Sequence, residues 1–246
     1  MKSWALVTGA SRRLGAGLAA HLAEQGWSVA LSWKTHEDEA QSLAAELRRS
    51  GAETRVFFAD FSVPEASERL WQKLVESCSQ PPRLVVHSAS EWVRDTVHNV
   101  QEKNWFDALR VQSWPLVVFA KELYRAWPNA GAALVTLLDA RTGSATPAEF
   151  SYGWGKRLAQ GLVSDLALQV APRVRVNGLA LGPVLRADSV PAELWSSWQK
   201  TLPLELPLSV DDVFMSFDAL LQSPVLTGQI LYVDGGLHLT RSKYNG

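Results

Sequence analysis

The sequence predicts a single α/β domain over residues 1–246, built on a doubly wound parallel sheet of about seven strands with helices on both faces. Three observations predict this architecture. A chain of 246 residues with 47% hydrophobic content can bury the core of one such domain. Short apolar runs alternate along it with longer segments of helical period. Strands separated by helices form right-handed crossover units, which bring the strands into a parallel sheet.

The first half of the chain alternates strand and helix. Residues 4–8 are a short apolar run that predicts a buried strand. Leu14, Leu18 and Leu22 then recur every fourth residue, as on one face of an amphipathic helix, and Gly26 is placed to end it. The next expected elements are a strand at 29–33, a helix at 37–49 closed by Gly51, a strand at 55–59, a helix at 64–78 and a strand at 84–87.

The second half continues the same alternation. We expect a helix at 103–126 ended by Pro128, a strand at 133–138, a helix at 152–169, a strand at 174–176, a Pro-rich segment with a short helix, a helix at 210–220 and a last strand at 230–233. Ligands of such sheets bind at the carboxyl ends of the strands. Functional residues are therefore expected directly after each strand.

Composition and charge exclude several functional classes. The 24 Lys and Arg residues balance 25 Asp and Glu residues, so no overall charge indicates a nucleic-acid or membrane partner. The lone Cys78 excludes an intrachain disulfide framework and a multi-cysteine zinc site, and no other metal-ligand spacing is present. Neither a membrane span nor a signal peptide is recognisable. We therefore expect a soluble, cytoplasmic protein without a metal.

A glycine-bearing turn follows the first strand. It runs from Thr8 through Gly9, Ser11, Arg12, Arg13 and Leu14 to Gly15. Such a turn between a strand and a helix lets the backbone approach a pyrophosphate, whose charge the helix N-terminus stabilises. Its spacing matches neither G-x-G-x-x-G nor a P-loop. The turn predicts a dinucleotide site through its position in the first strand–helix unit.

The end of the second strand indicates which dinucleotide is bound. Enzymes that use NAD usually place an acid there to accept from the ribose 2′-OH. This strand instead ends in Trp33, Lys34 and Thr35, and Lys34 together with Arg12 or Arg13 can neutralise a 2′-phosphate. NADPH is therefore the expected cofactor. After the third strand, Asp60 is a candidate acceptor for the adenine amino group.

Tyr152 and Lys156 form a candidate catalytic pair, since residues four apart share one face of a helix. We expect the Lys156 ammonium to lower the pKa of the Tyr152 phenol and make it a better acid. The pair follows a strand that ends at Asp139, thirteen residues upstream of the tyrosine. An Asp beside Tyr152 can orient the phenol or a water and help to deliver a proton.

These residues make the chain resemble the short-chain dehydrogenase/reductase family, with its Rossmann-type fold, over essentially its whole length. The matching positions are the turn from Gly9 to Gly15, Asp60, Ala89, Tyr152 with Lys156, Asn177 and the run from Val233 to Gly236. Within the family, the chain resembles pteridine reductases and bacterial dihydromonapterin (dihydrofolate) reductases, because Asp139 stands where most members have a serine. The runs 32–36, 59–62, 87–92 and 191–195 also resemble that subgroup.

The resemblance implies a role for each matching residue. Asp139, Tyr152 and Lys156 are implied to be catalytic, and Arg13, Ser90, Trp92, Asp139 and Tyr152 to bind a pterin, which stacks on the Trp92 indole. The implied NADP(H) contacts are Gly9, Ser11, Arg12, Arg13, Leu14, Gly15, Trp33, Lys34, Thr35, Asp60, Phe61, Ser88, Ala89, Ser90, Tyr152, Lys156, Gly182 and Val184. A segment near 183–209 is implied to cover the substrate, and helices at 101–127 and 152–169 to form a homotetramer.

The leading hypothesis is an NADPH-dependent reductase that takes a 7,8-dihydropterin or dihydrofolate, as its small-molecule substrate, to the tetrahydro form. One alternative is a short-chain reductase of a carbonyl substrate, such as a 3-oxoacyl thioester or a sugar. The other is a protein that binds NADPH without turnover. His87, Ser88 and Gln112 motivate the second alternative, because each departs from the family's usual Asn at its position.

Overall fold

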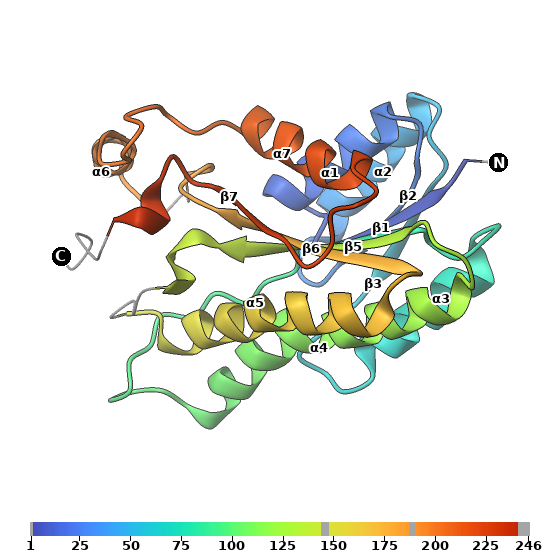
Figure 1. The fold of residues 1–246 in the computed structure, drawn as a ribbon, viewed down its shortest axis with the longest axis horizontal. Coiled ribbons are helices and arrows are strands. Elements are labelled where there is room, and N and C mark those ends of the chain that lie inside the picture. The colour runs from blue at the N-terminus through green and yellow to red at the C-terminus, as the bar shows by residue number, and fades with distance from the viewer. Residues whose placement is uncertain (1, 144–147, 187–189, 241–246) are drawn as a thin grey trace.

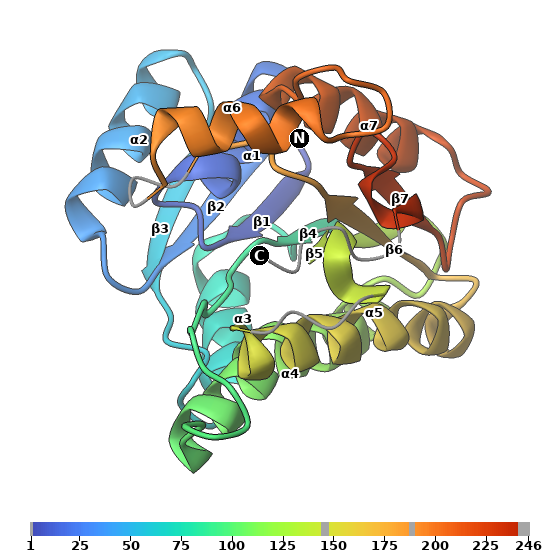
Figure 2. The ribbon, with the colours of Figure 1, turned by 90° about the vertical axis from the view of Figure 1, so that its left-hand side faces the viewer.

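The structure is a computed structural model that describes residues 2–143, 148–186 and 190–240. Seven parallel strands form one sheet (Figure 1) in the order β3-β2-β1-β4-β5-β6-β7, which can be followed in Figure 2. They are β1 (Trp4–Thr8), β2 (Ser28–Trp33), β3 (Thr54–Phe58), β4 (Leu84–His87), β5 (Ala132–Asp139), β6 (Val174–Leu181) and β7 (Ile230–Val233). The predicted fold class, an α/β protein with a doubly wound parallel sheet, is confirmed.

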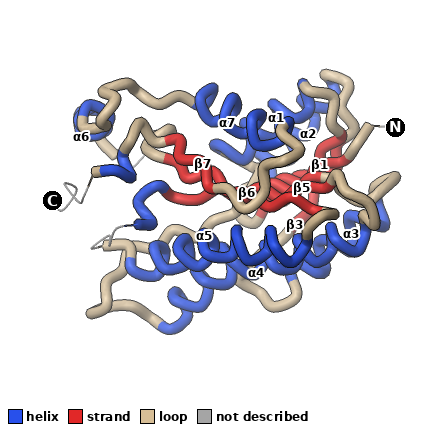
Figure 3. The backbone as a smooth tube through the Cα atoms, viewed as in Figure 1, coloured by secondary structure: helices blue, strands red, loops and turns tan. Residues whose placement is uncertain are grey.

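Helices cover both faces of the sheet (Figures 1 and 2). One face carries α1 (Arg13–Glu24), α2 (Glu37–Arg49) and α7 (Val210–Gln222), and the other carries α3 (Ala66–Ser77), α4 (Glu102–Ala126) and α5 (Phe150–Val170). The short α6 (Ala192–Lys200) lies beyond the carboxyl ends of the strands and buries none of its residues. The strands run between the two helical layers (Figure 3), with 3-10 turns at Ala140–Gly143 (η1) and Leu237–Leu239 (η2).

Alternation along each strand divides the core in two. Successive strand side chains point to opposite faces, and both faces of this sheet are covered, so both sets are apolar. In β1, Leu6 packs with Phe119 on the side of α3, α4 and α5, whereas Val7 packs with Phe217 on the side of α1 and α7. All four side chains are fully buried, and each such burial contributes about 1.5–3 kcal/mol of transfer free energy.

The direction in which successive strands are added to the sheet reverses between β1 and β4. From β1 the chain adds β2 and β3 on one side, and from β4 it adds β5, β6 and β7 on the other. This is the switch point at which open parallel sheets form a crevice for a ligand. Among the described residues, no helix combines the length and apolarity that crossing a bilayer requires.

Strand β6 is five residues longer than the predicted strand at 174–176. The pair Asn177–Gly178 has the composition of a turn, but here it continues the strand. The Asn177 amide donates to Leu226 O (2.9 Å) and accepts from Gln229 N (3.0 Å), so it joins β6 to the loop before β7. Gly178 lies against Leu138, since a Cβ on the glycine would come within 2.6 Å of Leu138 Cδ1.

Candidate active site

The turn after β1 is a glycine cradle against the end of β4. Gly9 has a φ of +61°, and a Cβ on it would lie 2.8 Å from Ala89 Cα. A Cβ on Gly15 would lie 2.3 Å from Gly9 O. Neither position has room for a side chain. The two glycines therefore let the turn after β1 pack closely against the loop after β4 and against the first turn of α1, at the carboxyl edge of the sheet. The α1 N-terminus has no side-chain cap, which suits it to an anion.

Thr8 and His87 together hold the loop after β4 in place. The Thr8 hydroxyl accepts from the backbone N–H groups of Ser88 and Ala89, both at 3.1 Å, and donates to His87 Nδ1 at 2.9 Å. His87 Nε2 lies 3.0 Å from Val111 O. Because a carbonyl only accepts, the imidazole proton is on Nε2. Burial, together with the Lys156 charge, lowers the pKa of His87 to about 3, so the ring stays neutral.

A cavity of about 270 Å³ extends from the cradle toward β2. Its lining includes Gly9, Ser11, Trp33, Thr35, Phe61 and Ser90. These residues come from the carboxyl ends of β1, β2, β3 and β4, as the sequence predicts for an adenosine site. The Trp33 ring meets Phe58 edge-on, with centroids 5.0 Å apart. The cradle and this cavity fit a dinucleotide cofactor.

Lys34, the predicted partner of a 2′-phosphate, is paired with two carboxylates. Its Nζ lies 3.3 Å from Asp60 Oδ1 and 3.2 Å from Glu91 Oε2. Partial burial opposes the lysine charge, but Glu91 and Asp60 outweigh it and raise the pKa of Lys34. Asp60 Oδ1 also accepts from Ser62 N (2.9 Å) and Ser62 Oγ (2.7 Å). Glu91 was not predicted as a site residue.

Arg13 connects the glycine turn to the segment after β6. Its backbone has a φ of +56°, and its guanidinium donates to Leu185 O (2.9 Å) and Arg186 O (3.2 Å). The exposed Arg12 forms no ion pair with any residue in the described ranges. Arg13 is thus bound to the predicted covering segment 183–209, of which residues 187–189 lie outside the described residues. Of the two arginines, Arg12 is therefore the one whose guanidinium forms no ion pair within the described ranges.

Gly182 and Val184 lie where β6 ends. Gly182 N donates to Val233 O at 3.0 Å, and Val184 N donates to Gly182 O at 2.9 Å. A Cβ on Gly182 would lie 2.8 Å from Asp234 Cα, so the glycine permits the close approach of β6 and β7. Both predicted cofactor residues therefore lie at the same edge of the sheet as the glycine turn.

Tyr152 and Asp139 lie side by side at the end of β5. The Tyr152 hydroxyl donates to Asp139 Oδ2 at 3.0 Å. The first turn of α5 is positioned by the buried Asp95, which accepts from the backbone N–H and the hydroxyl of Ser151. Because Asp95 belongs to the segment after β4, it fixes the tyrosine relative to the β4 loop. The structure thus brings together the acid and the phenol that the sequence singles out.

Arg141 and Glu149 extend this pair, and neither was predicted. Arg141 donates to Asp139 through its backbone N (2.8 Å), its Nε (3.1 Å) and its Nη2 (2.7 Å). Although burial opposes ionisation, Arg141 dominates and lowers the pKa of Asp139. Arg141 Nη2 also lies 3.1 Å from Glu149 Oε2. The other carboxylate oxygen of Glu149, Oε1, accepts a hydrogen bond from Trp92 Nε1 at 3.1 Å. A basic residue two positions after the acid was the available signal.

The expected effect of Lys156 on Tyr152 is wrong. Burial and the negative charge of Asp139 raise the pKa of Tyr152 well above its ordinary value. Lys156 Nζ donates to Leu137 O at 2.8 Å and lies 5.9 Å from the tyrosine ring centroid. Burial lowers the pKa of Lys156 to about 8. The phenol therefore keeps its proton at neutral pH, and the carboxylate beside it is the anion.

The remaining predicted substrate residues, Ser90 and Trp92, lie on the loop after β4. The Trp92 indole is 51% exposed although its N–H is bound to Glu149, so a large part of the ring surface is open. Ser90 is exposed nearby on the same loop. Gln112 is buried, and its Nε2 donates to Glu91 O at 3.3 Å. Its Oε1 has no hydrogen-bond partner among the described residues.

Sequence comparisons relate the chain to known reductases. A family model described as enoyl-(acyl carrier protein) reductase matches residues 9–238. The 3-oxoacyl-[acyl-carrier-protein] reductase FabG of Staphylococcus epidermidis is 23% identical over 245 residues, covering 97% of this chain and 100% of that protein. The 1-cyclohexenylcarbonyl-CoA reductase of Streptomyces collinus is 27% identical over 248 residues, covering 95% of this chain and 86% of that protein.

Two solved structures are similar along nearly the whole chain. FolM alternative dihydrofolate reductase 1 from Brucella canis, complexed with NADP, superimposes with a TM-score of 0.91 at 27% identity, covering 99% of this chain and 96% of that chain. The corresponding FolM protein from Brucella suis, also in complex with NADP, gives a TM-score of 0.88 at 27% identity, covering 98% of each chain.

Proposed function

The chain belongs to the short-chain dehydrogenase/reductase family of oxidoreductases and uses NADP, and from this premise we propose that it reduces a pteridine ring. The substrate class is a 7,8-dihydropterin or dihydrofolate, which is converted to the tetrahydro form. The observation that carries the proposal is the ionised Asp139 held between Arg141 and Tyr152. The two NADP-bound FolM dihydrofolate reductases support it as similar structures.

The glycine cradle and the cavity beside it would hold the cofactor. Gly9, Gly15 and the first turn of α1 suit the pyrophosphate, and Trp33, Lys34 and Asp60 surround the adenosine end. Lys156 lies at the other end, beside Tyr152, where its ammonium can grip the nicotinamide ribose. When bound, NADPH supplies the hydride that is added to a ring carbon of the substrate.

Tyr152 and Asp139 would supply and direct the proton. The phenol holds its proton at neutral pH and is the donor within reach of a substrate at this edge. Asp139 is an acceptor only, because Arg141 keeps it ionised. It can accept N–H groups from a pterin ring while Tyr152 delivers a proton to the ring nitrogen beside the reduced carbon. Asp139 thus orients the donor and the substrate.

The same carboxylate disfavours a ketone. Reduction of a carbonyl builds negative charge on an oxygen, and an anion held next to that oxygen raises the barrier. A serine hydroxyl at this position would donate to that oxygen, whereas Asp139 has no proton to donate. The local charge at the end of β5 therefore favours a substrate rich in N–H donors.

Trp92 would bind the flat ring. Its indole is held by the hydrogen bond to Glu149, and Glu149 is itself held by Arg141, so the ring is oriented relative to Asp139. Stacking of a flat heteroaromatic ring on an indole contributes about 1 kcal/mol beyond area burial. Arg141 and Glu149 thus link the proposed stacking surface to the proposed proton site.

Carbonyl reduction is the second candidate. It is favoured by the activities for which the sequence relatives are named, which include a 3-oxoacyl reductase matched over its whole length. Asp139 opposes it for the electrostatic reason above. The experiment follows NADPH oxidation with dihydrofolate and 7,8-dihydrobiopterin in one series and with 3-oxoacyl thioesters and simple ketones in the other. Turnover of a dihydropterin well above that of every carbonyl compound is the expected result.

Two variants test the assigned roles. Asp139→Asn keeps the shape of the side chain but removes its charge, and Tyr152→Phe removes the proton donor. Each is expected to lower kcat with the dihydropterin by about 10²-fold or more, while the Kd for NADPH stays within about twofold. Rates with carbonyl compounds that exceed those with dihydropterins, or no turnover with any substrate, would refute the proposed reaction.

A further inference from the structure

Lys34 and Glu91 form an ion pair across the mouth of the adenosine cavity. Lys34 follows β2 and Glu91 follows β4, and the turn after β1 lies between them. Both residues line the cavity of about 270 Å³. Their N–O separation is 3.2 Å, and both side chains are more than one-third exposed, with accessibilities of 38% and 37%. The cation expected to recognise a 2′-phosphate is therefore already partnered by a carboxylate.

The charges around Lys34 are mostly negative. Asp60, in the segment after β3, is paired with Lys34. The first turn of α2 adds three more acids, Glu37, Asp38 and Glu39. His36 Nδ1 lies 3.3 Å from the Glu39 carboxylate. The nearby cations on the turn after β1 are Arg12 and Arg13, and Arg13 is bound to the carbonyls of Leu185 and Arg186. A phosphate monoester with a charge of about −1.5 to −2 must enter against this field.

Glu91 differs from Asp60 in how it is held. Asp60 has two hydrogen bonds from Ser62 that fix its carboxylate without Lys34. The Glu91 carboxylate has Lys34 as its partner, and no other hydrogen bond or ion pair to it occurs among the described residues. Glu91 can therefore release Lys34 by rotating its own side chain, whereas Asp60 cannot.

We infer that Glu91 competes with the 2′-phosphate of NADPH for the Lys34 ammonium, and so reduces the preference of the protein for NADPH over NADH. NADH has only a hydroxyl at this position and gains little from Lys34, so the competition weakens one cofactor selectively. This inference concerns cofactor binding and does not rest on the pteridine substrate.

The test measures the Kd of NADPH and of NADH by fluorescence titration, without any second substrate. Glu91→Gln keeps the length of the side chain and removes its charge. Its Kd for NADPH is expected to fall by roughly threefold or more, while the Kd for NADH stays within about twofold. Because the ion pair is exposed, the gain should shrink in high salt. Glu65→Gln, which changes an exposed acid at the start of α3 that is paired with Arg69 and does not line the cavity, is the matched charge control and should change neither Kd.

Lys34→Met shows whether Glu91 acts through Lys34. It should weaken NADPH binding, and in its background Glu91→Gln should give a clearly smaller gain than in the wild type. An unchanged ratio of the two Kd values in Glu91→Gln overturns the inference. An equal gain with and without Lys34 also overturns it, since Glu91 would then act by direct repulsion. Either failure leaves the reductase assays, which use a different readout, unaffected.

Discussion

His87 is neutral in the fold because both ring nitrogens are bound inside it. Its Nε2–H donates to Val111 O, and its Nδ1 accepts from Thr8, which in turn holds the N–H groups of Ser88 and Ala89. A proton on Nδ1 would remove the acceptor and place a charge beside Lys156 in a buried site. The pKa of His87 is accordingly about 3, far below its ordinary value of 6.5.

This histidine is expected to make the fold acid-sensitive. Between pH 6.5 and pH 3 the unfolded chain binds a proton at His87 and the folded chain does not, so stability falls as the pH is lowered. The loss from His87 alone is about 2 kcal/mol between pH 6.5 and pH 5. His87→Gln keeps one donor and one acceptor but does not titrate. Urea unfolding at both pH values should therefore show a smaller acid loss in this variant.

The exposed His98 provides the matched control. His98→Gln should leave the difference in unfolding free energy between the two pH values unchanged. If His87→Gln loses as much stability as the wild type on acidification, the neutral His87 of the fold is contradicted. The comparison uses the change with pH, so a lower stability of the variant at neutral pH does not affect it.

The residues found from sequence are those that stand at fixed places relative to strand ends. Asp139 ends β5, Tyr152 and Lys156 follow it at recognisable spacings, and Gly9 and Gly15 follow β1. Arg141, Glu149 and Glu91 were not predicted, because what distinguishes them is side-chain pairing between segments that are separate along the chain. The pKa of Tyr152 was mispredicted for a related reason, since it depends on burial and on the orientation of the Asp139 carboxylate.

At the scale of elements, the junction of β6 with the loop before β7 depends on one buried amide. Asn177 is 1% exposed and satisfies the carbonyl of Leu226 and the N–H of Gln229. Asn177→Ala would leave both backbone groups without partners. It is expected to destabilise the fold by about 2–4 kcal/mol in urea unfolding.

Asn99→Ala is the control for that substitution. Asn99 also accepts from a backbone N–H, that of Thr96 at 2.7 Å, but it is exposed, so water can replace it. Its loss should cost less than about 1 kcal/mol. Equal effects of the two substitutions would show that Asn177 does not support the junction as described.

Periodicity predicted element type well and element ends less well. Strands β1, β4 and β7 and helix α2 have the predicted bounds. Strand β6 does not, because the local turn preference of Asn177 and Gly178 is overridden by pairing with β5 and β7. Helix α5 begins at Phe150, two residues before the predicted start, since Asp95 from a distant segment caps it. In both cases, contacts with segments distant along the chain determine where the element begins or ends.

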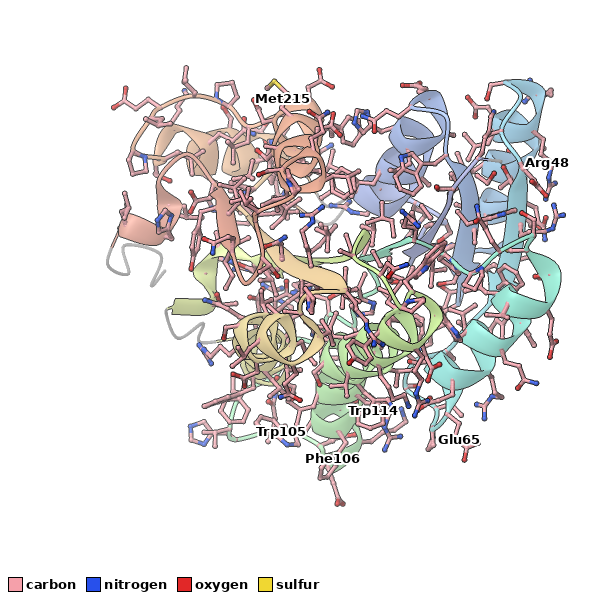
Figure 4. All side chains as sticks on the ribbon, turned by 45° about the vertical axis from the view of Figure 1, so that its right-hand side comes forward. Arg48, Glu65, Trp105, Phe106, Trp114 and Met215 are labelled. Carbon is pink, nitrogen blue, oxygen red and sulfur yellow. The ribbon has the colours of Figure 1, made fainter. Side chains whose placement is uncertain are left out.

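At the scale of the whole molecule, α4 and α5 present an exposed apolar surface. Figure 4 shows Trp105, Phe106 and Trp114 on the side of α4 that faces away from the sheet. Phe106 is 52% exposed, Trp114 47% and, on α5, Leu158 43%. Large exposed apolar groups on adjacent helices are typical of a protein–protein contact. They fit a contact between subunits, and the homotetramer that the sequence resemblance implies stays a prediction.

Sedimentation velocity can test this assembly. The wild-type chain is expected to sediment as a tetramer, and Leu158→Glu to sediment as a smaller species because it places a charge in the contact. Val75→Glu is the matched control, since Val75 is equally exposed (43%) but lies on α3. A monomeric wild type, or the same shift in both variants, would contradict the prediction.

The bonds from Arg13 to Leu185 and Arg186 have a kinetic consequence. The Arg13 guanidinium joins the turn that is proposed to hold the pyrophosphate to the segment that is proposed to cover the substrate. That segment cannot swing outward without giving up both bonds, and the cradle cannot loosen without the same loss. If both ligands bind as proposed, outward movement of this segment to release the second ligand would require both Arg13 hydrogen bonds at the glycine turn to break.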